Sequence, residues 1–351
     1  MNHRLRIITV GATTSFTIAA LAGCGGGAPG PSASPSGQRT ATAADRAAAG
    51  AAAEKALGDG RIEDGVRLAA FAAAAGDAMS LELYGRALLA KAAMLDARHQ
   101  DASAVRASAA DQYRRAADLD AANAGLQHAT AMVLDGAGDA AAARSYYDRA
   151  VTAAPKRSEF ILHRGNARLR SGDRDGAAND ARVLAELAPD DAWTHAFAAE
   201  VDLARNEPLA AAIKATKATT LAPDNVAFRV IRARSLRESG RATDAVELLS
   251  ALPVADRSAG FVAEELARGW TALERHEKAA DTWQRLHATQ PNDLRSAIEA
   301  ARSRLKSGDR LAARSLIDEA KRIAPDAPEI AELERTLIEA SDRRPDASSH
   351  Q

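Results

Sequence analysis

Prolines recur through the second half of the chain at a fixed interval, and this interval constrains the fold more than any other feature. Steps of 34 residues separate Pro155, Pro189 and Pro223, and the same phase returns at Pro291 and Pro325. Each of these prolines follows an amphipathic stretch, where its ring stops one helix and the next helix can begin a few residues later. We therefore expect a regular array of short helices.

Small residues keep the same 34-residue phase as the prolines. One column holds alanine or glycine at every step: Ala131, Gly165, Ala199, Ala233, Ala267 and Ala301. A second column holds alanine only: Ala143, Ala177, Ala211, Ala245, Ala279 and Ala313. Between the two columns, glycines mark a turn inside the repeat: Gly138, Gly172, Gly240 and Gly308. The array is therefore built from units of two helices joined by a turn.

A period of 34 residues with this punctuation resembles the tetratricopeptide repeat, a helix–turn–helix unit. The family pattern has small residues at repeat positions eight and twenty, an aromatic residue at twenty-four and proline at thirty-two. The repeat 124–157 matches with Ala131, Ala143, Tyr147 and Pro155, whereas several other repeats lack the aromatic residue. The resemblance implies an all-α fold, a superhelical α-solenoid of about seven to eight helix–turn–helix units plus a C-terminal capping helix.

The repeats and their flanks define the expected organisation of the chain. Upstream of residue 124 the phase weakens, so those helices are expected to form divergent repeats. In order, the segments are a signal peptide at 1–23, a lipidated cysteine and flexible tether at 24–42, divergent helical repeats at 43–123, six 34-residue repeats at 124–327, a capping helix at 328–343 and a disordered tail at 344–351.

The first residues have the layout of a secretory signal. Arg4 and Arg6 give a basic start, and the uncharged apolar stretch that follows is shorter than the roughly twenty residues of a transmembrane helix. It ends in Leu21-Ala22-Gly23-Cys24, which resembles the lipobox of bacterial lipoproteins. That resemblance implies that Cys24, the only cysteine of the chain, is the lipid-attachment site. A plain secretory signal or an uncleaved anchor is the alternative.

The residues after the cysteine bear on location. Gly25 stands where an aspartate is the usual signal for retention in the inner membrane. We therefore expect a lipid-anchored protein of the bacterial cell envelope, on the outer membrane and facing the periplasm. The stretch up to Thr42 is rich in glycine, proline and serine and has no apolar face to bury, so it is expected to act as a flexible tether.

Composition and motifs argue against several classes of function. Lysine and arginine total 46 against 47 acidic residues, for a net charge of −1, without the basic excess of a nucleic-acid binder. A single cysteine excludes an intrachain disulfide and a thiolate-rich metal site. The eight histidines are scattered, and no phosphate-binding glycine loop or Gly-x-Ser-x-Gly turn is present. We expect no enzyme activity, catalytic residue, metal, cofactor or nucleic-acid partner.

The family resemblance also implies a binding face. In tetratricopeptide-repeat proteins the first helices line a concave groove that takes extended peptides or partner helices. At groove position nine, successive repeats place arginines that suit an acidic segment because guanidinium groups bind carboxylates through paired hydrogen bonds. Exposed aromatic residues in the groove suit apolar side chains of the same ligand. The candidate peptide-binding residues are Arg234, Arg268, Arg302, Asn166, Trp193 and Phe261.

Alternatives stay open for these residues. The arginines can instead pair with neighbouring acids as solvated surface charge, with Glu238, Glu264, Glu265 and Glu299 as the partners within reach. The aromatic residues can pack between repeats. Asn166 matches a position that chaperone-binding members use, but Leu162 stands where they have lysine, so chaperone-peptide binding is not expected.

The expected function is that of a membrane-anchored scaffold or adaptor in the cell envelope. It binds other proteins or extended peptides, acidic ones among them, through its concave groove. The alternative is a regulatory or accessory subunit of an envelope assembly, secretion or pilus-biogenesis complex.

Overall fold

The computed structural model describes residues 41–342, which form eighteen helices. No strand occurs in this part of the chain, so the prediction of an all-α fold is confirmed. No helix within it is long and apolar enough to cross a membrane. The predicted signal peptide, Cys24, nearly all of the predicted tether and the predicted tail at 344–351 lie outside the described residues.

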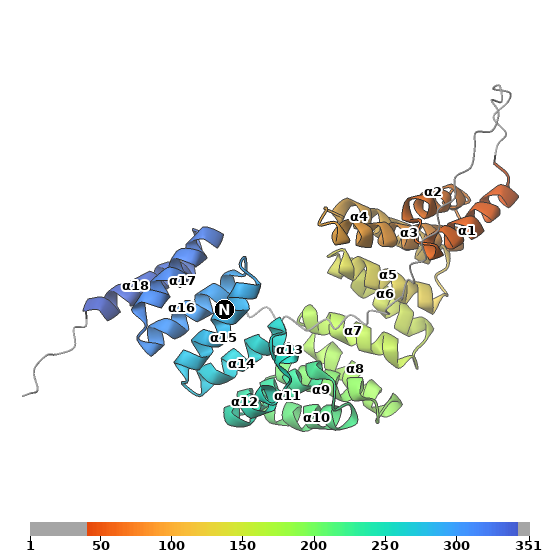
Figure 1. The fold of residues 1–351 in the computed structure, drawn as a ribbon. Helices are drawn as coiled ribbons and strands as arrows, with labels where there is room; N and C mark the ends of the chain where they lie inside the picture. The colour runs from red at the N-terminus through yellow and green to blue at the C-terminus, as the bar shows by residue number, and fades with distance from the viewer. Residues whose placement is uncertain (1–40, 343–351) are drawn as a thin grey trace, which may run out of the picture. The chain divides into compact units, whose positions relative to one another are not determined.

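The chain divides into two compact units, and the division falls after Asp173. Within the N-terminal unit each helix packs against the next one along the chain (Figure 1). Its helices are α1 (Ala43–Gly58), α2 (Ile62–Ala73), α3 (Ala78–Ala97), α4 (Ser103–Leu119), α5 (Ala124–Gly136), α6 (Ala140–Ala153) and α7 (Ser158–Arg170).

The C-terminal unit starts at Arg174 and also packs its helices in chain order. The last helix, α18, contacts both α16 and α17 and so covers the end of the array, as expected of a capping helix. The helices are α8 (Arg174–Leu187), α9 (Ala192–Ala204), α10 (Pro208–Leu221), α11 (Val226–Glu238), α12 (Ala242–Ser250), α13 (Val254–Arg257), α14 (Gly260–Ala272), α15 (His276–Thr289), α16 (Leu294–Ser307), α17 (Arg310–Ile323) and α18 (Pro328–Asp342).

Several first helices begin at polar caps, and five second helices end before the repeating prolines. Asn123, Asp191 and Asn225 precede α5, α9 and α11, and the side chain of each accepts a hydrogen bond from the backbone N–H three residues on. These bonds satisfy amides that have no partner inside the helix. Each in-phase proline lies two residues beyond the end of a second helix, as Pro223 does after Leu221.

Both columns of small residues are buried where helices pack. Ala199 and Ala233 of the first column and Ala211 of the second are fully buried. In the shared core of α9, α10 and α11, Ala211 packs in one cluster with Phe228. A methyl group at these positions lets helix axes approach closely, and stacking of neighbouring hairpins supplies the core that one hairpin lacks.

Each regular repeat turns through one residue in the left-handed conformation. The four in-phase glycines have φ between 82° and 87°. In the remaining two repeats the same position is held by Asn206, with φ 63°, and Glu274, with φ 57°. Left-handed backbone is uncommon for residues with a side chain. The turn geometry therefore persists where the glycine is missing.

One repeat departs from the regular pattern at its second helix. α12 has nine residues, against fourteen in α10 and α15. Pro253 then caps the four-residue helix α13, and the Arg257 guanidinium donates a hydrogen bond to the Ser250 carbonyl across 3.0 Å. Position 257, where the repeat pattern has proline, holds arginine, and proline comes four residues earlier at 253. The second helix of this repeat ends five residues sooner than α10 does in the preceding repeat.

Candidate peptide-binding face

The first helices of the C-terminal unit share one side of that unit. α11 contacts both α9 and α14, and Arg295 of α16 pairs with Glu264 of α14 at 2.7 Å (Figure 1). We call the surface that these four helices present the first-helix face. Its charged and exposed aromatic side chains are Trp193, Glu200, Arg234, Arg237, Phe261, Glu264, Glu265, Arg268, Arg295, Glu299 and Arg302.

The three predicted arginines lie on α11, α14 and α16 of the first-helix face, at the same register position. Their side chains are 30%, 32% and 33% exposed, so each guanidinium keeps a solvent-facing part. Each is also paired with an acid of its own helix: Arg234 with Glu238 at 2.9 Å, Arg268 with Glu264 at 2.6 Å and Arg302 with Glu299 at 2.6 Å. The row is therefore charge-compensated within the chain, and its binding of an acidic segment stays a prediction.

Further ion pairs join neighbouring first helices. Arg237 of α11 pairs with Glu265 of α14 at 2.6 Å, and Arg268 lies 3.6 Å from the same carboxylate. Glu264 forms an ion pair with Arg295 of α16 as well as with Arg268. Three successive first helices are thus tied together by alternating charges.

Glu200 of α9 holds the register position that the three arginines hold in the later repeats. Among the described residues, none pairs with or hydrogen-bonds to its carboxyl group. Desolvation raises the pKa of Glu200 to about 7, and the positive charge of Arg234 offsets part of that effect. Sequence analysis missed this residue as a candidate, although the reversal of charge within the column is visible in the sequence.

The two predicted aromatic residues both lie on the first-helix face with part of the ring in solvent. Trp193 of α9 is 40% exposed and Phe261 of α14 is 38% exposed. Trp193 meets Phe228 of α11 edge to face, with ring centroids 4.9 Å apart and planes at 82°. Phe228 and Phe197 are themselves buried in the core. The Trp193 ring is therefore held in place by Phe228 while keeping part of its surface free.

In the N-terminal unit, the predicted residue Asn166 is partly exposed on α7. A histidine pair that sequence analysis did not foresee joins the same helix to α5. The ring nitrogens His128 Nε2 and His163 Nδ1 lie 2.6 Å apart, and the ring planes differ by 9°. This nitrogen separation is too short for rings packed face to face, so the rings meet edge to edge and share one hydrogen bond.

The surroundings of this histidine pair oppose protonation. Burial lowers the pKa of His128 to about 4, and the positive charges of a protonated His163 and of Arg157 act in the same direction. Burial also lowers the pKa of His163. On one side His128 packs against Phe160, with ring centroids 4.4 Å apart. The two histidines are 35 residues apart, which is one repeat plus one residue, so they lie on the first helices of consecutive repeats. Histidine spacing within a single helix therefore does not predict the pair.

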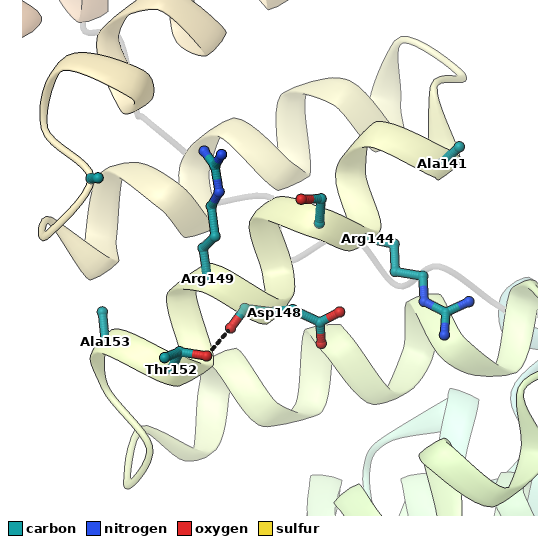
Figure 2. Close-up of a pocket in the computed structure, with 8 residues that line it drawn as sticks. Ala141, Arg144, Asp148, Arg149, Thr152 and Ala153 are labelled. Carbon is teal, nitrogen blue, oxygen red and sulfur yellow. Dashed lines mark hydrogen bonds between the residues drawn. The ribbon is translucent and has the colours of Figure 1, made fainter.

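A shallow depression of about 610 Å³ lies over α6 in the N-terminal unit, and Figure 2 shows its lining. The residues are Ala121, Ala141, Arg144, Ser145, Asp148, Arg149, Thr152 and Ala153. The charged ones are engaged elsewhere, since Arg149 pairs with Asp118 at 2.8 Å and Arg144 with Asp173 at 3.2 Å. The Thr152 hydroxyl donates to the Asp148 carbonyl across 2.8 Å. The depression therefore offers a ligand few free polar groups.

Comparison with known proteins places the fold. No model of a known protein family matches the sequence, and no curated protein matches it. The solved structure of PilW, a widely conserved type IV pilus biogenesis factor, is similar with a TM-score of 0.56 and 16% identity, covering 60% of this chain and 97% of PilW. A tetratricopeptide repeat protein from Parabacteroides merdae is similar with a TM-score of 0.55 and 14% identity, covering 72% of this chain and 98% of that one.

A third similar structure is the Cut9–Hcn1 hetero-tetramer of the APC/C, with a TM-score of 0.54 and 14% identity, covering 72% of this chain and 55% of the matched chain. At these identities the likeness concerns the fold. Together with the repeat period, the buried small-residue columns and the repeated turn, it shows that the chain has the fold of the tetratricopeptide-repeat proteins.

Proposed function

We propose that this protein is a membrane-anchored scaffold, which binds other proteins or extended peptides in the cell envelope through its first-helix face. The observation that carries the proposal is the face itself. It combines exposed aromatic rings with rows of partly exposed charges on helices that are tied to one another. Side chains of this kind suit recognition of another chain, because aromatic and arginine residues contribute most to protein interfaces. The proposed role is binding rather than catalysis.

The anchoring part of the proposal rests on the sequence. Cys24 in a lipobox-like segment supports lipid attachment, and the tether that follows would let the folded repeats stand away from the bilayer. Gly25 after the cysteine supports the outer membrane, with the repeats facing the periplasm.

A second candidate is an accessory subunit of a dedicated envelope complex. The similarity in fold to PilW, a type IV pilus biogenesis factor, supports pilus biogenesis as the first such process to examine. In this case the partner is one defined subunit, whereas a general scaffold has many weaker partners.

The test is affinity purification of the full chain from envelope extracts, followed by quantification of each co-purifying protein. We expect at least one partner at a defined ratio, and its recovery should fall for Phe261→Ala on the first-helix face. A matched control is Leu209→Ala on α10, where the side chain is 68% exposed and lies on a second helix. A single stoichiometric partner favours the accessory subunit. Absence of any partner, or equal loss with both variants, argues against binding through the first-helix face.

A further inference from the structure

The charges of the first-helix face are almost fully matched inside the chain. Each of the five arginines named on the face pairs with at least one glutamate of the same face or the same helix. Glu264, Glu265 and Glu299 are the glutamates of the face that take part in these pairs. Glu200 is the one glutamate of the face that does not, because among the described residues none pairs with its carboxyl group. The face therefore offers an incoming chain one acidic group that has no partner within it.

Glu200 shares its side of α9 with the exposed Trp193. The two residues are seven positions apart, which is close to two helical turns, so their side chains lie on one side about 10 Å apart along the helix axis. Trp193 is 40% exposed and is held edge-on by Phe228 of the neighbouring helix. One face of α9 thus combines a fixed aromatic ring with a carboxyl group.

We propose that this part of α9 is a subsite for a positively charged side chain, lysine or arginine, of an extended partner segment that also places an apolar side chain on Trp193. The inference rests on the proposed function and names the chemistry of the partner. It also reverses the charge of the ligand that the arginine row suggests from the sequence.

The energetics of Glu200 support a cationic occupant. Glu200 is partly buried, and a carboxylate that is partly removed from water without a partner is unfavourable; the raised pKa of Glu200 reflects this cost. An ammonium or guanidinium group would supply the missing charge-assisted hydrogen bonds. Arg234 is the charged residue that lowers the pKa of Glu200, but its guanidinium group already pairs with Glu238 at 2.9 Å.

The spacing of the two side chains fits an extended peptide. In the polyproline II conformation, residues three positions apart point to the same side and lie about 9 Å apart, so a basic and an apolar residue at this spacing can reach Glu200 and Trp193 together. An indole ring also attracts a cation that lies over its face, so it tolerates the stem of a lysine or arginine beside the apolar contact.

The experiment uses the full chain and three fluorescein-labelled peptides of nine residues in a glycine–serine background. The first has a lysine and a leucine three positions apart, the second has glutamate in place of the lysine, and the third has alanine there. Fluorescence polarisation gives the three dissociation constants. We expect the lysine peptide to bind about ten-fold more tightly than the alanine peptide, and the glutamate peptide to bind least.

Two variants and a matched control locate the effect. Glu200→Gln should bring the lysine peptide to the affinity of the alanine peptide, and Trp193→Ala should weaken the lysine and alanine peptides alike. Glu247→Gln removes an exposed glutamate of the second helix α12, outside the first-helix face, so it should leave the preference for lysine unchanged. Circular dichroism confirms that each variant keeps its helices.

Tighter binding of the glutamate peptide, or a lysine preference that survives Glu200→Gln, overturns the inference. If Glu200→Gln has no effect while envelope partners are still captured through the first-helix face, the inference fails and the scaffold function stands. If no peptide binds and no envelope partner is captured, both fail.

Discussion

Arg237 of α11 donates to Glu265 of α14 across 2.6 Å, and the two residues belong to consecutive repeats. The glutamate side chain is only 4% exposed and the arginine 18%. A carboxylate at this depth is stable only while its partner remains, since the cost of desolvation is otherwise uncompensated. The pair is therefore a buried link between two first helices rather than a surface salt bridge.

Replacement of Arg237 by methionine should destabilise the protein by about 2–4 kcal/mol, because it leaves the Glu265 carboxylate buried with only Arg268 at 3.6 Å. Chemical denaturation measures the loss, and hydrogen exchange should place it in α11 and α14 first, since damage in a repeat array spreads between neighbours. The double variant Arg237→Met, Glu265→Met removes both charges and should recover most of the loss. A double variant less stable than the single one would contradict this account.

Substitutions at the left-handed turn residue should change the stability of the protein in opposite directions in two repeats. Gly240 has φ 85°, so Gly240→Ala forces a side chain into that conformation and should cost about 1 kcal/mol. Glu274 already carries a side chain at φ 57°, so Glu274→Gly should be neutral or stabilise by up to about 1 kcal/mol. Thermal unfolding of both variants tests the pair. Equal destabilisation by both would mean that the backbone conformation does not decide the effect.

The sequence predicts the architecture well because the constraints repeat. Prolines, small residues and glycines each return at one period, and each has a single physical role, as a helix stop, a close crossing or a left-handed turn. The sequence does not reveal that Glu274 adopts the same turn, because glutamate rarely enters the left-handed region, whereas asparagine, as at Asn206, is among the residues that tolerate it. The short α12 and the added α13 follow from Pro253, whose effect on helix length depends on how the next hairpin packs.

The candidate site is less predictable because it depends on which side chains meet. The register of Arg234, Arg268 and Arg302 follows from the repeat, but their pairing with glutamates depends on rotamers that the period does not set. The missing partner of Glu200 is likewise a property of its surroundings. The histidine pair forms only because α5 and α7 lie side by side, and the residue spacing within either helix does not predict that contact.

Acid should destabilise the N-terminal unit through the histidine pair. The pKa of His128 is about 4 in the folded chain, against an ordinary value of 6.5, so the unfolded chain binds the proton more tightly between these values. Stability is therefore retained above about pH 6.5 and falls as the pH drops towards 4, by roughly 2–3 kcal/mol for this group. Denaturation series between pH 4 and pH 7.5 measure the slope.

The control is His128→Gln, which keeps a hydrogen-bonding group towards His163 but does not titrate in this range. The slope of stability against pH should become clearly smaller in this variant. An unchanged slope would assign the acid sensitivity to other groups.

Lipid attachment is tested at Cys24. Cys24→Ser removes the thiol that acylation requires, so the protein should move from the membrane fraction to the soluble fraction or accumulate as an unprocessed precursor. Fractionation and the mass of the mature N-terminus measure both outcomes. A variant that is still processed and still membrane-bound would show that the lipoprotein interpretation is wrong.

The arginine row can be tested with a variant that respects its ion pairs. Replacing the three arginines by glutamate would set acid against acid at Glu238, Glu264 and Glu299, so any lost binding could come from damage to the helices. Glutamine is the better choice, because it removes the charge, is a good helix former and adds no repulsion. These pairs are partly exposed, and Glu238 and Glu264 each keep another arginine, so the triple variant should still fold.

We expect the triple variant Arg234→Gln, Arg268→Gln, Arg302→Gln to capture its envelope partner within about two-fold of the unaltered chain, since the three guanidinium groups are already matched by glutamates. Quantified co-purification at low and at physiological salt measures this. A strong loss at low salt that disappears as salt is raised would instead show that the arginines bind an acidic segment, because exposed charges are screened over about 8–10 Å. The same variant leaves Glu299 without its arginine, whereas Glu238 keeps Arg237 and Glu264 keeps Arg295, so a basic partner should if anything be held more tightly.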